Sequence, residues 1–291
     1  MSRSAATLAY EVVDVFTDRA LLRGNPLAVV LDADDLPAEA LQAPAAEFAL
    51  SETAFPLAGE AGEYGLRIFT PAVELAFAGH PSVGAAWVLH RLGRLPAGRV
   101  VQSCGAGRLD VEVSAEGARL AGGPPHPGAP LDPAPLLAAV GLEGDDVAGP
   151  AALAGCGSDF AYLLVRPEAV ARAVPDVAVL HALLGDLGLS VTAWDGHAAR
   201  SRVFHPSAGV AEDPATGSAA VGLGVHLAAA GLLPDGTTAY DVHQGAELGR
   251  PSLMHCTVRV EDGRAVATTV GGSVVPVASG NVQRPCCSQR N

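Results

Sequence analysis

The sequence contains no lysine, because all 18 of its basic residues are arginine. A lysine amine forms the Schiff base of pyridoxal phosphate enzymes and of class I aldolases, and a Walker phosphate-binding loop also requires one. The chain therefore belongs to none of these three classes.

Positive charge and long apolar runs are also scarce. The 18 basic residues face 31 acidic ones, for a net charge of −13, and no basic cluster stands out. This balance disfavours nucleic acid and anionic membranes as partners. Residues 1–10 lack the apolar segment of a signal peptide, and glycines interrupt every apolar stretch long enough to suggest a membrane span. We expect a cytoplasmic protein whose partner is a small molecule.

The cysteines and histidines form no recognisable ligand set. The five cysteines lack C-x-x-C spacing, and their odd number argues against a disulfide framework. Cys286 and Cys287 are adjacent in a polar tail that we expect to be poorly ordered. The nine histidines have no metal-ligand spacing with cysteines or acids, so no metal is predicted. Neither Gly105-Ala106-Gly107 nor Gly155-Cys156-Gly157 is followed by the helix and acid of a dinucleotide fingerprint, which argues against NAD.

What the sequence does contain is one internal repeat. Arg67-Ile68-Phe69-Thr70-Pro71 returns 135 residues later as Arg202-Val203-Phe204-His205-Pro206. Downstream, Ala78-Gly79-His80 returns 138 residues later as Thr216-Gly217-Ser218. Each copy has the pattern of a strand, a polar turn and an apolar helix. The repeat predicts a duplicated domain and a site between the halves, to which each half contributes one turn and one helix N-terminus.

The predicted organisation follows from this repeat. We expect an N-terminal half at residues 1–119, a Gly- and Pro-rich linker at 120–135, a C-terminal half at 136–280 and a tail at 281–291. Short strand patterns outnumber helices in both halves. The fold class is therefore α+β, with two pseudo-symmetric domains, each a mostly antiparallel sheet around one helix.

Both central helices are expected to be buried. Residues 81–92 and 218–233 are apolar on nearly every side, and a helix of that kind is typical of a core. A third helix is expected at residues 37–48, where Pro44 should kink or divide it.

His80 and Gly79 form the first candidate for chemistry. His80 stands at a helix N-terminus, where unpaired backbone donors and the helix dipole disfavour a proton on the ring and attract an anion such as a substrate carboxylate. The alternative is that His80 serves only as a helix cap.

The second candidate is the turn with Asp213, Thr216, Gly217 and Ser218. Asp and Ser are ordinary capping residues, and capping is the alternative interpretation here. The symmetric position of His80 favours a functional turn instead. Two positive helix ends facing one cleft would hold a carboxylate.

Glu52 is the third candidate. A lone acid in an apolar strand usually lies on the solvated face, and that is its alternative interpretation. If the side chain points inward, burial favours its neutral form, as a general acid/base near neutral pH requires.

Taken together, these residues resemble the PhzF-like (phenazine biosynthesis) family, which has the diaminopimelate epimerase fold. The resemblance spans residues 10–277. It rests on the order and spacing of six stretches: Gly24-Asn25-Pro26, Ser51-Glu52-Thr53, Arg67-Ile68-Phe69-Thr70-Pro71, Gly79-His80-Pro81, Asp213-Pro214-Ala215-Thr216-Gly217-Ser218-Ala219, and Gln244-Gly245 with Gly249-Arg250-Pro251-Ser252.

The resemblance implies two barrel-like domains, each around a central helix, and isomerisation without a cofactor. It implies that Glu52 is the catalytic acid/base and that His80, Asp213 and Ser218 support it. Within the family, PhzF acts on trans-2,3-dihydro-3-hydroxyanthranilate by moving a proton along the conjugated ring. A homodimer is also an expectation from the resemblance.

Two alternatives stay open. One is an amino-acid or hydroxyproline-type epimerase or dehydratase on the same scaffold. Related epimerases carry a cysteine in each helix-leading turn, where this chain has Ala78 and Thr216, which counts against a two-thiol mechanism. The other is a small-molecule binding protein without catalytic activity.

Overall fold

The computed structural model describes residues 6–20, 22–206 and 210–285. The chain forms two compact units. Unit 1 comprises residues 1–120 and 272–291, and unit 2 comprises residues 121–271. The C-terminal strand begins in unit 2 and ends in unit 1. Unit 2 therefore ends at residue 271, whereas the sequence had predicted that the C-terminal half runs to residue 280.

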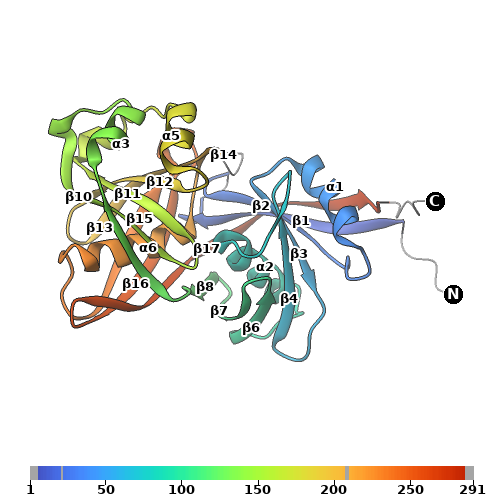
Figure 1. Cartoon of the computed structure of the whole chain (residues 1–291). Coiled ribbons are helices and arrows are strands. Elements are labelled where there is room, and N and C mark those ends of the chain that lie inside the picture. The colour runs from blue at the N-terminus through green and yellow to red at the C-terminus, as the bar shows by residue number, and fades with distance from the viewer. Residues whose placement is uncertain (1–5, 21, 207–209, 286–291) are drawn as a thin grey trace. The chain divides into compact units, whose positions relative to one another are not determined.

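Unit 1 is a closed ring of strands with helices inside and outside it (Figure 1). Its elements are β1 (Thr7–Thr17), β2 (Asn25–Val30), α1 (Ala38–Phe48), β3 (Glu52–Leu57), β4 (Glu63–Phe69), β5 (Glu74–Leu75), α2 (Gly79–Arg91), β6 (Gly98–Cys104), β7 (Gly107–Val113), β8 (Gly117–Ala121) and the last part of β17 (Arg264–Gln283).

The ring of unit 1 closes through its final strand. The pairing order is β17, β1, β2, β3, β4, β6, β7 and β8, and β8 pairs again with β17. Among the described strands of this ring, the β2–β3 and β4–β6 pairs are parallel. Closure leaves no unpaired sheet edge among these described strands.

Unit 2 repeats the order of strands and the central helix of unit 1 and adds further short helices. Its elements are β9 (Pro125–Leu131), α3 (Pro133–Ala139), η1 (Gly144–Asp146), β10 (Val147–Cys156), β11 (Asp159–Val165), α4 (Pro167–Val170), α5 (Val177–Leu184), β12 (Gly188–Trp194), β13 (Ala198–His205), β14 (Val210–Asp213), α6 (Gly217–Ala229), β15 (Gly236–Gln244), η3 (Ala246–Leu248), β16 (Ser252–Glu261) and the first part of β17.

The pairing pattern of unit 2 repeats that of unit 1. Its order is β9, β10, β11, β12, β13, β15, β16 and β17. The β11–β12 and β13–β15 pairs are parallel, as their counterparts are in unit 1. The Gly122 amide donates to the Thr268 carbonyl and so links the segment before β9 to β17. The predicted fold class, α+β with two mostly antiparallel units, is confirmed, and so is the barrel-like form that the family resemblance implies.

Each ring encloses one helix that is buried almost from end to end. All residues of α2 from Gly79 to Leu89 are buried, and so are most of those in α6. In unit 2 the hydroxyls of Tyr162 and Tyr240 donate to the carbonyls of Ala219 and Ala220 on α6, both at 2.8 Å. Gly222 permits this approach, because a Cβ there would lie 2.2 Å from the Tyr162 hydroxyl.

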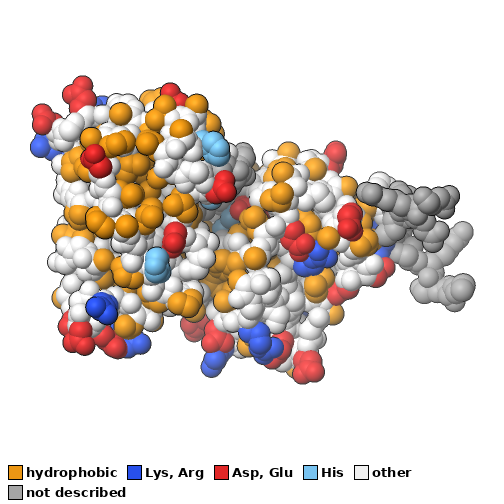
Figure 2. All heavy atoms as spheres, viewed as in Figure 1, with side chains coloured by type: hydrophobic (Ala, Val, Ile, Leu, Met, Phe, Trp, Pro, Cys, Tyr) orange, Lys and Arg blue, Asp and Glu red, His pale blue; other side chains and the backbone are white. Residues whose placement is uncertain are grey.

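Shorter helices cover the outside of the rings. In unit 1, α1 packs on β3 and β4. In unit 2, α3, α4 and α5 pack over β10 to β13. The face of α5 that does not pack carries exposed Val177, Val179 and Leu183, and Figure 2 shows hydrophobic side chains gathered over the region of α3 and α5.

One local prediction was wrong. Residues 120–135 are not a linker, since they contain the end of β8, all of β9 and the start of α3. Of the two outcomes expected at Pro44, a division of the helix does not occur, because α1 continues through this residue. The expected tail at 281–291 begins inside β17, and Cys286 and Cys287 lie outside the described residues. No helix among the described residues is long and apolar enough to cross a membrane.

Candidate active site

The arginine of each repeat clamps the segment that leads to a central helix. In unit 1, Arg67 on β4 donates to both carboxylate oxygens of Glu74 on β5, each at 2.7 Å. In unit 2, Arg202 on β13 donates to Glu212 on β14 at 2.8 and 2.7 Å. Such two-point pairs fix geometry as well as charge. The repeat in the sequence therefore corresponds to a repeated device that holds the two helix-leading turns.

Glu52 is placed by the end of α1. The helix stops at Ala49, whose backbone is left-handed (φ 51°) and whose amide donates to the Ala45 carbonyl. Glu52 then opens β3 and pairs in register with Leu27 on the parallel strand β2. Its side chain is 17% exposed, so it is not on a freely solvated face.

A chain of polar side chains connects Ser51 to His80. The Ser51 hydroxyl donates to Oδ1 of Asn25 at 3.1 Å. Nδ2 of Asn25 therefore faces Nδ1 of His80, at 3.4 Å. An amide nitrogen can only donate, so this network assigns Nδ1 as the acceptor and places the proton of the neutral ring on Nε2.

His80 is buried and uncharged at neutral pH. Its side chain is 4% exposed, and burial lowers the pKa of the imidazole to about 3. Nε2 lies 3.6 Å from Oε2 of Glu52. Because the ring is neutral, this contact is not an ion pair; it brings an N–H group close to a carboxylate at a distance slightly longer than a hydrogen bond.

Neither central helix has a side chain that caps its N-terminus. The N-cap residues are Ala78 for α2 and Thr216 for α6, and neither helix has a side-chain cap hydrogen bond. The capping interpretation of His80 and Ser218 is therefore wrong, since both residues lie inside the first turn. Within the described part of the chain, no side-chain cap satisfies the first-turn amides, which include those of Gly79 and Gly217.

Asp213 belongs to a second polar group at the start of α6. The Thr216 hydroxyl donates to Oδ2 of Asp213 at 2.6 Å. Gln244, on β15, donates from Nε2 to the Asp213 carbonyl at 2.7 Å and to the Thr216 hydroxyl at 3.0 Å. Its Oε1 accepts from the Thr216 amide at 3.3 Å. The buried side-chain amide of Gln244 thus binds both Asp213 and Thr216 and stabilises the turn between them.

A glycine next to Gln244 makes this arrangement possible. Gly245 has φ +77°, and a Cβ on it would lie 2.4 Å from the Arg250 carbonyl and 2.6 Å from the Pro214 carbonyl. Only glycine fits such a close backbone approach in a left-handed conformation. The polar turn seen in the sequence at Gln244-Gly245 is therefore a support for the Asp213 turn.

The structure groups the candidate residues by unit. Glu52 and His80 lie together in unit 1, and Asp213 and Thr216 lie together in unit 2, with half-buried Ser218 one residue inside α6. Within the described residues, no three His, Cys, Asp or Glu side chains are placed to hold a metal ion.

Sequence reasoning assigned no role to Asn25 or Gln244, although both lie in stretches that it singled out. Asn25 reads as part of a turn and Gln244 as the edge of one. Their partners are 55 and 28 residues away, so no local pattern reveals them. The one sequence feature that could have indicated them is that each of these amide side chains stands next to a turn glycine, Gly24 or Gly245.

Comparison with known proteins identifies the scaffold. The family model described as "Phenazine biosynthesis-like protein" (PhzC-PhzF) matches residues 13–280. The trans-2,3-dihydro-3-hydroxyanthranilate isomerase of Pseudomonas aeruginosa is 35% identical over 288 residues, which cover 93% of this chain and 98% of that protein. Other relatives of similar identity are named as isomerases without a stated substrate.

Solved structures give the same result. The PhzF-family phenazine biosynthesis protein of Bacillus anthracis has a TM-score of 0.86 at 25% identity, with 96% of this chain and 99% of that chain covered. A hydroxyproline epimerase of Agrobacterium vitis has a TM-score of 0.66 at 14% identity, with 98% and 95% covered, and shares the fold.

Proposed function

Because this chain belongs to the PhzC-PhzF family and is an isomerase, we propose that it moves a proton on a small carboxylate-bearing substrate, with Glu52 as the acid/base and without a cofactor. The observation that carries this proposal is the half-buried Glu52 carboxylate 3.6 Å from the neutral imidazole of His80. The named relative makes trans-2,3-dihydro-3-hydroxyanthranilate the first substrate to test.

In the proposed reaction, Glu52 as carboxylate takes a proton from a carbon of the substrate. The electron pair left behind is delocalised into the conjugated, carboxyl-bearing system. Glu52, now neutral, returns the proton to another carbon of that system. His80 keeps its proton on Nε2 near the Glu52 oxygen, where an N–H group stabilises the ionised form of the acid.

The remaining residues have binding roles in this proposal. The first-turn amides of Gly79 and His80 donate to the substrate carboxylate, since a helix N-terminus with no side-chain cap favours an anion. Gly217, Ser218 and Thr216 at the start of α6 bind polar groups of the substrate. Asp213, whose carboxylate is positioned by Thr216, binds a polar group of the substrate and influences the protonation state of that group.

Epimerisation through two thiols does not fit this chain. The residues directly before the two central helices are Ala78 and Thr216. The described cysteines are Cys104, Cys156 and Cys256, and the last two are buried. Burial raises the pKa of the Cys156 thiol to about 11, so the reactive thiolate is scarce at neutral pH.

The test is deuterium incorporation from heavy water into trans-2,3-dihydro-3-hydroxyanthranilate, followed by mass spectrometry. Loss of a positioned acid/base typically costs 10² to 10⁴-fold in rate. The exchange rate of the Glu52→Gln variant should therefore fall at least that far, while its thermal unfolding transition stays unchanged. Glu63→Gln, which alters an exposed ion pair with Arg108, is the matched control and should keep full activity. Near-normal turnover by Glu52→Gln would contradict the role of Glu52.

The result also separates substrate from scaffold. No exchange by folded wild-type protein would remove this substrate and leave other small cyclic carboxylates as candidates. A homodimer and a cytoplasmic location are also part of the proposal, and the molar mass measured by light scattering tests the first.

A further inference from the structure

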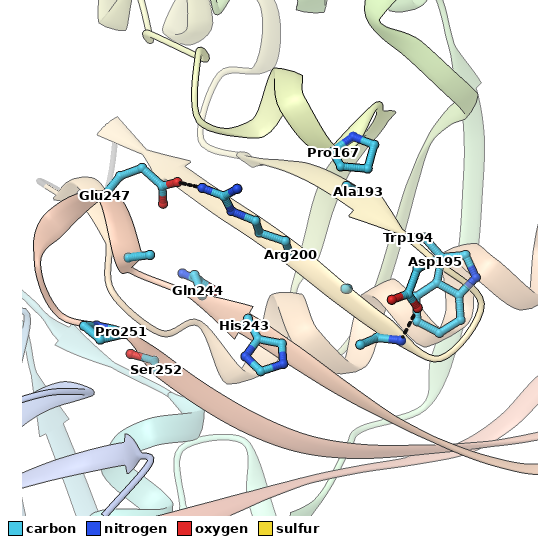
Figure 3. Close-up of a pocket in the computed structure, with 13 residues that line it drawn as sticks. Pro167, Ala193, Trp194, Asp195, Arg200, His243, Gln244, Glu247, Pro251 and Ser252 are labelled. Carbon is cyan, nitrogen blue, oxygen red and sulfur yellow. Dashed lines mark hydrogen bonds and ion pairs between the residues drawn. The ribbon is translucent and has the colours of Figure 1, made fainter. Parts of the chain in front are cut away.

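Unit 2 contains a cavity of about 390 Å³ that the proposed reaction does not use. It lies where β12 ends and β13 runs parallel to β15, beneath Pro167 of α4 and beside the loop that contains η3. Figure 3 shows its lining. Its volume is that of a small-molecule site.

Most of the lining is apolar and flat. Half-buried Trp194 lies at one end, Pro251 lies at the other end, and Pro167 lies nearer to Trp194 (Figure 3). Tyr240 packs edge-on against Trp194, with ring centroids 6.0 Å apart and an interplanar angle of 86°, so the indole has a defined position. An indole face and two proline rings suit a planar ring.

The polar groups in the cavity have unused donors. Arg200 and His243 are direct partners on the parallel strands β13 and β15, which places both side chains on one face of the sheet. Arg200 uses Nη2 to pair with Glu247. Within the described part of the chain, its other nitrogens, the His243 ring and the Trp194 indole N–H make no hydrogen bond to protein.

Each of the two acids in the cavity has one carboxylate oxygen that already accepts from protein groups. Glu247 is paired with Arg200. Oδ1 of Asp195 accepts the amides of His197 and Ala198 at 2.8 and 2.7 Å. The Asp195 carboxylate lies at the Trp194 end and Arg200 toward the other (Figure 3). A ligand with one carboxylate at the Arg200 end satisfies the donors, while a second negative charge near Asp195 would be repelled.

We propose that this cavity is a second small-molecule site, which binds a ring-bearing monocarboxylate. The ring lies against Trp194, at the end of the cavity nearer to Pro167. The carboxylate accepts hydrogen bonds from the free guanidinium N–H groups of Arg200, which suit a two-point contact. It also accepts one from the His243 ring.

Gln244 connects this cavity to the Asp213 turn. It contributes to the cavity lining, and its side chain makes the three hydrogen bonds that hold Asp213 and Thr216. The loop after it is tied back by the Arg250 amide, which donates to the Gly245 carbonyl at 3.0 Å. A ligand that pushes on this loop therefore shifts the turn. This regulatory consequence rests on the proposed function, whereas the binding site itself does not.

Binding is tested with benzoate, by Trp194 fluorescence in a Trp87→Phe variant and by calorimetry on the wild-type chain. The chain has two tryptophans, so Trp194 is then the only indole reporter. Benzoate should bind at least tenfold tighter than benzamide, benzylamine or phthalate at matched ionic strength. Equal affinity for benzamide, or tighter binding of benzylamine, would overturn the proposal.

Two variants make the test specific. Arg200→Gln should weaken benzoate binding at least tenfold, whereas Arg259→Gln, an exposed arginine on β16 paired with Glu261, should leave it unchanged. Glu247→Gln removes the competitor of the ligand for Arg200, so it should strengthen binding several-fold. A gain of affinity cannot arise from misfolding, and an Arg200→Gln or Glu247→Gln variant with wild-type affinity would overturn the assignment.

The effect on turnover is measured separately. Benzoate that binds at the catalytic site is insensitive to Glu247→Gln, whereas inhibition or activation through the second site shifts to lower benzoate concentration in this variant. If binding is confirmed but the deuterium exchange assay fails, the proposed substrate is wrong and the site stands. If turnover is confirmed and Trp194 does not respond to benzoate, the site is wrong and the reaction stands.

Discussion

Gln244 donates its side-chain N–H groups to both the Asp213 carbonyl and the Thr216 hydroxyl, at 2.7 and 3.0 Å. Since the Thr216 hydroxyl receives this bond, its own proton is directed to Oδ2 of Asp213. The amide on β15 thus determines the orientation of a carboxylate on β14, through a residue that begins α6.

The first prediction concerns Gln244 itself. Gln244→Ala removes both donors and should lower kcat/KM about tenfold or more, because the Asp213 turn loses its support. Steady-state kinetics on the deuterium exchange reaction measure this. Gln42→Ala removes a comparable amide bond, to the Thr70 carbonyl at 2.8 Å, and should cost about 1 kcal/mol of stability without a kinetic effect. Equal kinetic losses in both variants would refute a positioning role.

The second prediction separates the Thr216 hydroxyl from the shape of its side chain. Thr216→Val keeps the volume but removes the donor to Asp213, so turnover should fall about tenfold, the value of a lost hydrogen bond to a charged group. Thr216→Ser restores the hydroxyl and should recover most of the rate. A Thr216→Ser variant as slow as Thr216→Val would show that the methyl group matters instead.

The third prediction concerns the tautomer of His80. Asn25→Leu removes the donor to Nδ1, so the neutral ring is no longer fixed with its proton on Nε2 near Glu52. The ¹⁵N chemical shifts of the ring report the tautomer directly. We expect a dominant Nε2–H form in wild type, a mixture in Asn25→Leu, and a turnover reduced in proportion. An Nδ1–H form in wild type would contradict the assigned network.

The fourth prediction is a loss of stability in acid. Burial lowers the pKa of His80 to about 3 and that of His226 to about 4, the latter partly offset by a hydrogen bond to the Pro150 carbonyl, while both titrate near 6.5 when unfolded. The unfolded chain therefore binds about two more protons between pH 6.5 and 4. The free energy of unfolding should have its highest value above pH 6.5. It should fall as the pH decreases below 6.5, by at most about 2.7 kcal/mol per pH unit.

Denaturant titrations at several pH values measure this slope. His226 stacks on Tyr162 at 5.3 Å inside unit 2, so His226→Phe keeps a ring there while it removes one titrating group. The slope should fall to about half. An unchanged slope in this variant would assign the acid sensitivity to other groups.

The sequence predicted much of each unit and less of how its parts connect. The apolar patterns of the central helices and the repeated arginine were enough to predict two similar units. The run of prolines around Pro127 and Pro130 concealed β9, because proline cannot donate in a ladder and usually marks a loop. Here these residues pair in register with Ala154 and Ala152 of β10.

The sequence also suggests some residues of the candidate site and not others. Glu52, His80 and Asp213 could be named because they stand at strand ends and helix starts. Asn25 and Gln244 could not, since their roles depend on partners far along the chain. Local patterns indicate which groups could react, whereas only the tertiary structure shows what holds them.

The strand β17 affects the order in which the two units can fold during synthesis. Unit 2 is a continuous stretch and has all of its strands once residue 271 has been made. In the ring of unit 1, β1 pairs with residues of β17 up to Gln283. The N-terminal strands therefore cannot complete this ring until the part of β17 that follows unit 2 has been made. Vectorial synthesis usually completes the N-terminal domain first; in this chain the second unit is complete before the first.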